Sequence, residues 1–468
     1  MIRDTFLRRA TWFLLFVLHS ASVFSTEAAE VELVVEMPST PESIDLTRYS
    51  LGQGGLSDSP MFEQHVEQLT QLKPQTIRLF VQEYFNILPE RHSNNWETLD
   101  KAIEVIRATK AKPILSLCFK PSILFPKVDQ DTVHPKSYKE WGELVTQLVK
   151  HCNEQRRFGI EYWEIGNEPD IGEDGGCPYR FQPKDYLIYY TRTAEAIRRA
   201  DPRAKIGGPA LANYKSEIGD ALLEHCNNGK APLHFFSWHV YHNNPSYLRQ
   251  SIKDVNEKIA RYPKLKNVET ILDEWNMSLE KPILNPSFQP AFILETTSGF
   301  YEEGLSRSAY YHIRDYFVDP DLFSFMSSKG RLFMAHWWNV MPQYDGLYDQ
   351  QGQVRPAYYA FKLLSLIRGD KMLIKGTTPD VKGFAASQSK WNQVVIWNFP
   401  QKARGETAMV TMRFPTFQKG RFRSMQLNST RSVNNLEILR QGDVKELESE
   451  PLRFELAPYD IRWIEVTQ

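Results

Sequence analysis

The sequence has few of the features that mark several common protein classes. Its 468 residues include four cysteines, which show no CxxC spacing and no paired histidines, so a zinc site is not indicated. The formal net charge of −1 gives no electrostatic reason to expect a nucleic acid or an anionic membrane as a partner. The glycines at 52–55 do not form the GxGxxG fingerprint that cradles a phosphate. These absences argue against a cysteine-based zinc site, a nucleic-acid-binding protein and a dinucleotide-binding protein.

Long apolar runs are also scarce. One lies near the N-terminus, where three arginines precede an apolar stretch at 12–24 that small residues follow. We therefore expect residues 1–28 to be a signal peptide and the mature protein to be secreted or periplasmic, with no membrane span. The stretch is short for a bilayer and is interrupted by polar residues, and a retained anchor is the alternative. In an exported chain Cys177 could form a disulfide, whereas Cys118, in an apolar run, is expected to be a buried thiol.

Eight short apolar runs alternate with amphipathic stretches over most of the chain. Such runs are typical of parallel strands buried on both faces. They lie at 50–52, 76–81, 113–119, 160–165, 205–209, 235–241, 270–275 and 332–339. Helix-like segments lie at 96–110, 138–156, 183–200, 215–226, 247–260 and 357–366. This alternation predicts an α/β fold with a (β/α)8 TIM barrel over residues 45–370, and an open doubly wound sheet is the main rival.

The pattern changes after about residue 370. Apolar and polar residues now alternate with period two at 394–398, 408–412, 452–456 and 460–466, with glycine and proline turns between them. This alternation indicates antiparallel strands. We predict a C-terminal β-sandwich domain at 371–468, which a strand at 31–36 could join. No low-complexity linker separates the two domains, so we expect them to contact each other closely.

Two of the expected strands deliver a glutamate to the same end of the barrel. Glu168 follows the run at 160–165, and Glu274 ends the run at 270–275. In a (β/α)8 barrel the active face lies at the C-terminal ends of the strands, where strands four and seven approach each other. A single glutamate there is more typical of a salt bridge or a helix cap. Two of them, each within two residues of an asparagine, are what the cleavage of a glycosidic bond needs.

The residues around the two glutamates resemble those of a known family. Asn167-Glu168-Pro169 is similar to the Asn-Glu-Pro signature of the clan A glycoside hydrolases, in which the glutamate is the general acid/base. Glu274 lies where that clan has its nucleophile. Segments at 112–121, 237–241 and 346–361 resemble strands three and six and the segment after strand eight of glycoside hydrolase family 39, the β-xylosidase and α-L-iduronidase family. Ser116 departs from that family, which usually has a glutamate there, and puts the substrate in doubt.

The resemblance implies a retaining glycoside hydrolase that acts by double displacement, with Glu274 as nucleophile and Glu168 as acid/base. It implies an oligo- or polysaccharide substrate and no cofactor or metal. Among the activities of the family, a β-xylosidase-like exo-glycosidase is the first expectation. The alternatives are an α-L-iduronidase-like or endo-acting enzyme, an inactive carbohydrate-binding barrel and a metal-dependent hydrolase.

Six further residues are candidates for substrate binding or for support of the glutamates. Asn167 is expected to hold a sugar hydroxyl, with a helix cap as the alternative. Arg78, in an apolar strand, needs a partner and is expected to orient Glu274. The other four are expected to contact Glu274 or the sugar, with core packing as the alternative; they are His239 and Tyr241 at the end of the sixth strand, and Trp337 and Trp338 at the end of the eighth.

Two acidic neighbours of the pair are expected outside the sugar site. Glu164, four residues before Glu168, is expected to have a structural partner. Asp273, next to Glu274 along a strand, is expected to face the opposite side because side chains alternate.

Overall fold

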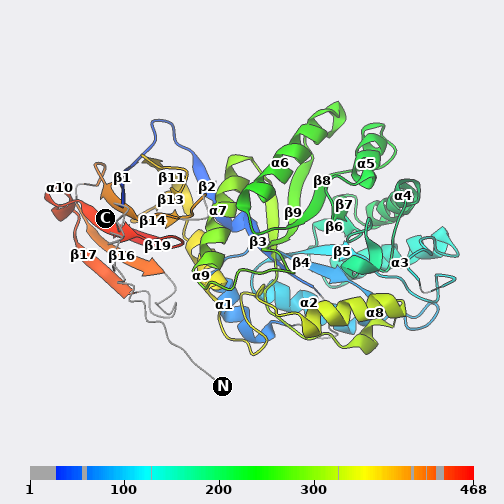
Figure 1. Ribbon diagram of the computed structural model, residues 1–468. Helices are drawn as coiled ribbons and strands as arrows, with labels where there is room; N and C mark the ends of the chain where they lie inside the picture. Colours follow the sequence, from blue (N-terminus) through cyan, green and yellow to red (C-terminus); the bar gives the residue numbers. More distant parts are fainter. Residues whose placement is uncertain are drawn as a thin grey trace, which may run out of the picture.

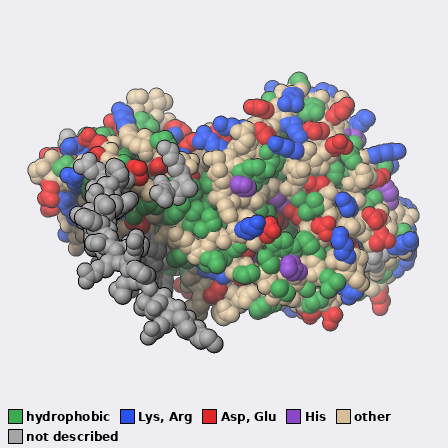
Figure 2. All heavy atoms as spheres, viewed as in Figure 1, with side chains coloured by type: hydrophobic (Ala, Val, Ile, Leu, Met, Phe, Trp, Pro, Cys, Tyr) green, Lys and Arg blue, Asp and Glu red, His purple; other side chains and the backbone are tan. Residues whose placement is uncertain are grey.

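The computed structural model describes residues 28–467 except 55–60, 128, 325, 402–404, 418 and 428–436. Almost all of the expected signal peptide, residues 1–27, lies outside the described residues. The chain forms two lobes, a barrel and a smaller β-sheet lobe to which both ends of the described chain contribute, and these lie side by side in Figure 1. On the face seen in Figure 2, acidic and basic side chains are interspersed over the barrel lobe.

Eight parallel strands close the barrel in the order β10-β3-β4-β5-β6-β7-β8-β9. Their side chains are almost all buried, which accounts for the near-continuous apolar runs in the sequence. The strands are β3 (Tyr49–Gln53), β4 (Thr76–Val81), β5 (Lys112–Leu117), β6 (Tyr162–Ile165), β7 (Lys205–Leu211), β8 (Phe235–Tyr241), β9 (Glu269–Asn276) and β10 (Arg307–Tyr311). The predicted (β/α)8 barrel is therefore confirmed.

Helices surround the barrel: α1 to α8 each follow a strand along the chain, and α9 follows α8. Their buried residues recur on one face, as expected for amphipathic helices that cover a sheet. They are α1 (Val66–Gln71), α2 (Glu97–Ala108), α3 (Tyr138–Lys150), α4 (Pro183–Ala200), α5 (Glu217–Asn227), α6 (Pro245–Ala260), α7 (Phe288–Glu302), α8 (Ser328–Ala335) and α9 (Pro356–Leu364).

The eighth strand was predicted at the wrong place. Residues 332–339 are not a strand: they belong to α8 and to the π-helical turn His336–Val340 that continues it. Ser327 caps α8, because its hydroxyl accepts a hydrogen bond from the backbone N–H of Gly330. Leu332 is 72% exposed, so the apolar run does not lie in a sheet. The true eighth strand is the short β10, which precedes this segment by some twenty residues.

Two sheets form the second lobe, as the alternating pattern predicts. One has the order β12-β1-β15-β18 and the other β17-β16-β19-β14-β13-β11-β2. β1 (Ala29–Glu36) covers the segment expected at 31–36 and pairs with β15. The remaining elements are β2 (Ser43–Asp45), β11 (Arg368–Lys371), β12 (Leu373–Lys375), β13 (Val381–Gln388), β14 (Trp391–Asn398), β15 (Ala408–Arg413), β16 (Arg421–Leu427), β17 (Glu437–Asp443), α10 (Glu446–Ser449), β18 (Leu452–Leu456) and β19 (Ile461–Thr467).

Helix α7 joins the lobes. It is buried along nearly its whole length, because one side lies on the barrel and the other on the β-sandwich. Its Glu295 accepts hydrogen bonds from Lys382 Nζ at 2.6 Å and Trp397 Nε1 at 2.9 Å. Phe288 packs against Phe399 with ring centroids 5.6 Å apart. One face of the larger sheet therefore joins the core of the barrel, and a second hydrophobic cluster fills the space between the two sheets.

The four cysteines are all buried free thiols, so Cys177 does not form the disulfide that the sequence allowed, and Cys118 is the buried thiol that was expected. Among the described residues, no helix combines the length and the apolar character needed to cross a membrane.

Candidate active site

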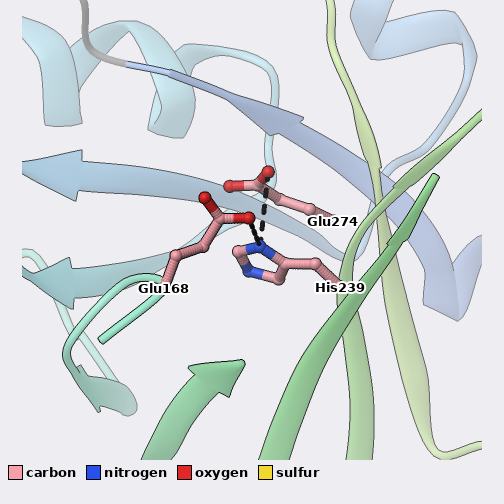
Figure 3. Close-up of side chains that lie close together, drawn as sticks. All are labelled: Glu168, His239 and Glu274. Carbon is pink, nitrogen blue, oxygen red and sulfur yellow. Dashed lines mark hydrogen bonds and ion pairs between the residues drawn. The ribbon is translucent and has the colours of Figure 1, made fainter. Parts of the chain in front are cut away.

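Glu168 and Glu274 meet at the C-terminal end of the barrel. Glu168 follows β6, Glu274 lies on β9, and both carboxyl groups contact the ring of His239 on β8 from the same side, as Figure 3 shows. His239 Nδ1 lies 2.9 Å from Glu168 Oε1 and 3.5 Å from Glu274 Oε2. The nitrogen and one oxygen from each carboxyl lie within 4.8 Å of one another. Two carboxyl groups 106 residues apart in the sequence therefore face one small space.

The backbone around Glu168 fixes its carboxyl group. Glu168 has φ +45°, in the left-handed region, and its N–H donates to the carbonyl of Ala210 at 2.8 Å. A Cβ built on Gly175 would overlap Glu168 Oε2, so only glycine leaves room for the carboxyl group. A positive φ at a residue other than glycine, as at Glu168, is a backbone strain that is concentrated at functional sites. Gly175 was not singled out from the sequence, where it reads as part of an ordinary loop.

Arg78 on β4 joins three acidic side chains beneath the site. Its guanidinium Nη1 lies 2.8 Å from Glu274 Oε1, and other nitrogens lie 2.7 Å from Glu164 Oε2 and 3.0 Å from Asp273 Oδ2. The ring of Phe80 covers the guanidinium at 4.6 Å. Glu274 is therefore held from below by a buried cation, as expected from the sequence, and Glu164 has the structural partner that it needs.

Arg78 also orients the side-chain amide of Asn167. Its Oδ1 accepts a hydrogen bond from Arg78 Nη2 at 2.9 Å, which directs its amide N–H groups away from the arginine. Asn167 lines the same cavity as the two glutamates, so its amide can donate to a sugar hydroxyl. Ser116, where the related family usually has a glutamate, accepts from Arg78 Nη2 at 3.2 Å and donates to the carbonyl of Gly166 at 2.7 Å.

The prediction that Asp273 faces away from the site is wrong. Asp273 Oδ1 lies 3.6 Å from His239 Nε2 inside the barrel. The reason is a β-bulge: Trp238 pairs with Leu272, but the next residue on β8, His239, pairs with Glu274. The extra residue on β9 lets two neighbouring side chains turn to the same side. Simple alternation cannot reveal such a bulge.

Tyr241 and His239 each hydrogen-bond a different glutamate of the pair. Tyr241 Oη donates to Glu274 Oε2 at 2.6 Å, whereas the short contact of His239 is with Glu168. Both oxygens of Glu274 thus accept a hydrogen bond, one from Arg78 and one from Tyr241. The sequence placed both residues near Glu274, and the structure assigns the closer contact of His239 to the other carboxyl group.

Comparisons with known proteins agree with this geometry. The family model described as Glycosyl hydrolases family 39 matches residues 77–409. The chain belongs to this family. A β-xylosidase of Caldicellulosiruptor saccharolyticus is 25% identical over 327 residues, which cover 64% of this chain and 62% of the relative. A β-xylosidase of Geobacillus stearothermophilus is 23% identical over 431 residues, which cover 84% of this chain and 76% of the relative.

A solved structure shows the same fold. The crystal structure of the family 39 enzyme from Xanthomonas axonopodis pv. citri matches with a TM-score of 0.73 at 16% identity, over 94% of this chain and 98% of that one. Membership of glycoside hydrolase family 39 makes this protein a glycoside hydrolase with a carbohydrate substrate.

Burial and charge set the protonation of this family 39 site. Burial raises the pKa of Glu168 to about 7, the charge of Glu274 adds to the rise, and the hydrogen bond from His239 opposes it. Burial also raises the pKa of Glu164 to about 8 despite the charge of Arg78. Burial acts against ionisation of Asp273 as well, but Arg78, Glu164 and His239 hold its pKa at about 2. Glu168 can therefore carry a proton near neutral pH, as a general acid requires.

A cavity of about 350 Å³ opens above the two glutamates. Trp338 lines it and stacks on Tyr316 at 5.0 Å between ring centroids, with Tyr311 at 6.0 Å. Trp337 lines it as well, next to Phe333 at 6.0 Å. The sequence expected one of the two tryptophans to enter the site from the end of a strand. Both line the cavity, because they lie on a helical turn after β10 and not on a strand.

The active site contains a group of side chains that could bind a metal ion. Among the described residues, Glu168, His239 and Glu274 are the group whose ligand atoms lie close enough to hold a metal ion. Arg78 already occupies one oxygen of Glu274 and places a positive charge beside it. The donor set therefore suits acid/base and nucleophilic chemistry better than a resident metal.

Proposed function

We propose that the protein is a retaining glycoside hydrolase in which Glu274 is the nucleophile and Glu168 the acid/base. Glu274 attacks the anomeric carbon while Glu168 gives its proton to the leaving oxygen, and a glycosyl ester forms on Glu274. Water, deprotonated by Glu168, then attacks the ester and releases the sugar with its original anomeric configuration. The observation that carries this proposal is the meeting of the two carboxyl groups at one nitrogen, Nδ1, of His239.

The separation of the carboxyl groups supports retention over inversion. Their nearest oxygens lie within 4.8 Å, and carboxyl groups about 5–5.5 Å apart suit a covalent intermediate, whereas about 6.5–9.5 Å leaves room for an attacking water. The change of role by Glu168 also has a physical basis. Once Glu274 becomes an ester its charge is lost, the pKa of Glu168 falls, and Glu168 can act as a base.

We propose a neutral glycone, with β-xylosides first. The two reported relatives are named β-xylosidases, and the charged residues among those that line the cavity are Glu168, Asp174 and Glu274, all acidic. A uronic acid would need a cation aimed at its carboxylate, and no lysine or arginine of the described part of the chain lines this cavity. An α-L-iduronidase-like activity is therefore the weaker alternative.

The small cavity favours exo action. Its volume of about 350 Å³ lies at the lower end of the range for ligand sites, which suits the end of a short glycoside better than the interior of a polysaccharide.

From the N-terminal sequence we also propose that the mature protein is secreted or periplasmic. Sequencing the N-terminus of the exported protein tests this, and an unprocessed chain retained in the membrane would contradict it.

The decisive experiment is a panel of nitrophenyl glycosides, with NMR to identify the first anomer released. We expect the β-xyloside among the substrates and a β-anomer as first product. Glu274→Gln should lower kcat by on the order of 10⁴-fold or more while sugar binding persists. The matched control is Glu269→Gln, at the other end of the same strand, which should leave kcat unchanged. Unaltered hydrolysis by Glu274→Gln would refute the assignment.

The same panel separates the other classes. A carbohydrate-binding barrel without activity would bind xylosides but release no sugar from any of them. A metal-dependent hydrolase would lose activity on treatment with a chelator and regain it with a divalent cation. We expect full activity in the chelator.

A further inference from the structure

The two sides of the cavity differ in chemical character, and the mechanism assigns a different part of the substrate to each. Because Glu168 protonates the leaving oxygen, the leaving group lies on the Glu168 side. That side is formed by Gly175 and Gly176, which follow Glu168 in the same loop, and by Met334 of α8. A Cβ built on Gly176 would lie 3.3 Å from Met334 Sδ. Helix α8 thus stands directly behind the acid/base.

Five apolar side chains line the cavity near α8 and the loops after β6 and β9. Phe333 and Met334 come from α8, Trp337 from the turn after it, and Ile171 and Leu279 from the loops after β6 and β9. Four of these five side chains, all but Met334, are half-buried and not packed away in the core. Apolar side chains that remain partly exposed inside a cavity gain free energy when a ligand removes them from water. We name these five residues the leaving-group wall.

The lining that Arg78 and Tyr241 hold in place around Glu274 is polar. Asn167, Tyr241 and Glu274 present an amide, a hydroxyl and a carboxylate there, each held by the hydrogen bonds described above. These groups suit the hydroxyls of a sugar ring. Within the leaving-group wall the indole N–H of Trp337 is the one side-chain hydrogen-bonding group, and Gln82 and Asp174 line the cavity next to it. A sugar hydroxyl placed against the other four side chains would lose its hydrogen bonds to water at a cost.

The wall is fixed in place before any ligand arrives. Glu173, 2% exposed and in the loop that carries Gly175, accepts a hydrogen bond from the backbone N–H of Ser327 at 2.8 Å and another from its hydroxyl. Lys329 lies 3.4 Å from Asp174 in the same loop. The N-terminus of α8 is therefore tied to the acid/base loop at two neighbouring points. In Figure 1, α8 lies along the barrel lobe, away from the β-sandwich.

We propose that the leaving-group wall is a binding site for an apolar aglycone, so that the substrates are glycosides of a neutral sugar with an alkyl, aryl or fused-ring alcohol. The proposal rests on the proposed function, because the mechanism assigns the leaving group to the Glu168 side. It adds the substrate class, in which a hydrocarbon and not a second sugar is released together with the monosaccharide.

The test is a series of β-glycosides of the sugar found with the nitrophenyl panel, from methyl to hexyl. Straight-chain alcohols beyond methanol differ little in acidity, so the series varies the buried apolar surface while the chemistry stays nearly constant. We expect kcat/KM to rise by about threefold to fourfold for each added methylene until the wall is covered. The hexyl glycoside should exceed the corresponding disaccharide. A flat series, or a disaccharide that is the better substrate, would overturn the proposal.

Variants of α8 locate the effect. Phe333→Ala and Met334→Ala should each lower the hexyl-to-methyl ratio of kcat/KM by about tenfold, and the volume-conserving Met334→Leu should keep it. The matched control is Leu332→Ala, on the same helix but 72% exposed and outside the cavity lining, which should leave the ratio unchanged. Equal effects of Leu332→Ala and Phe333→Ala would show general disturbance of the helix and would contradict the proposal.

Binding to Glu274→Gln separates this proposal from the proposed function. Calorimetric titration with the same alkyl glycosides needs no turnover, and affinity should rise with chain length. A rise in affinity without hydrolysis by the wild-type protein would preserve the site and refute the glycosidase. Hydrolysis by the wild type with no dependence on chain length, in rate or affinity, would do the reverse.

Discussion

The two ends of the barrel both carry networks of charged side chains, and they reach electrical balance in different ways. At the N-terminal end, Tyr162 Oη donates to Glu269 at 2.8 Å and accepts from Lys205 and Arg307, each at 3.0 Å. Lys205 also pairs with Glu161 at 3.0 Å. Tyr162 itself is buried, but the charged groups around it are half-exposed, and each cation is matched by a neighbouring carboxylate.

At the C-terminal end, the charges are buried and the carboxyl groups are in excess. Arg78 and His239 face Glu164, Glu168, Asp273 and Glu274, and none of the six is more than 9% exposed. The end is balanced by retained protons. Burial opposes the charge on His239, but Glu274 and Asp273 raise its pKa well above the ordinary value, while burial raises the pKa of Glu164 to about 8. Ion pairing makes one end insensitive to pH, and proton retention makes the other end responsive to it.

The largest effect that this comparison predicts comes from loss of the buried cation. Arg78→Met leaves Glu164, Asp273 and Glu274 without their shared partner, and removal of one member of a buried ionic network costs about 3–5 kcal/mol. We expect a lower free energy of unfolding by about that amount in denaturant titrations, together with loss of turnover. Arg78→Lys keeps a charge but not the planar fork, and should recover part of the stability and little of the activity. A stable and active Arg78→Met protein would contradict the view that this cation is indispensable.

The C-terminal end also has no spare volume beside the acid/base. In Gly175→Ala the new methyl group overlaps the carboxyl group of Glu168, although Gly175 has no positive φ and its backbone accepts alanine. We expect kcat/KM to fall by about 100-fold, as small misplacements of reacting groups do, with an almost unchanged melting temperature. The control is Gly142→Ala on α3, where the nearest atom lies at an ordinary 3.8 Å. Full activity of Gly175→Ala would show that Glu168 can move without cost.

Much of the barrel could be predicted because buried parallel strands leave a simple signal. Helix α4 has the predicted bounds, and seven of the eight strands were found from their apolar runs. The eighth failed because β10 is five residues long, while the longer apolar run that follows it belongs to α8 and lines a cavity. An apolar run indicates that residues are shielded from water, either in a sheet or along a cavity. A short run does not distinguish a strand from a helix.

The candidate site was predictable where it depends on strand ends and not where it depends on local irregularity. Glu168, Glu274 and Arg78 follow from their places on strands. Asp273 required knowledge of a bulge, and Gly175 required the position of a carboxyl group that only the folded chain provides. Trp337 and Trp338 were placed on the wrong element and still line the cavity, because the loop after β10 lies at the same end of the barrel.

The retained proton on Glu168 makes activity depend on pH. The pKa of Glu168 is raised to about 7, so the protonated form is present below pH 7 and kcat/KM should fall as pH rises through that value. The hydrogen bond from His239 lowers this pKa, and His239→Asn should therefore move the basic limb to higher pH. His242→Asn is the matched control, because His242 is exposed and stacks on Tyr247. A limb that moves to lower pH in His239→Asn would reverse the assigned role.

The smallest effect is expected at the N-terminal end, and it tests whether the contrast between the ends is real. Lys205→Met removes the ion pairs with Glu161 and Glu269, but Arg307 still donates to Tyr162 and water reaches the remaining carboxylates. Half-exposed pairs of this kind contribute about 1 kcal/mol or less. We expect a decrease of that size in the free energy of unfolding, no change in kcat/KM, and the same basic limb in the pH profile. Because the substitution removes one cation, as Arg78→Met does, a similar loss of stability in both variants would mean that burial does not distinguish the two networks.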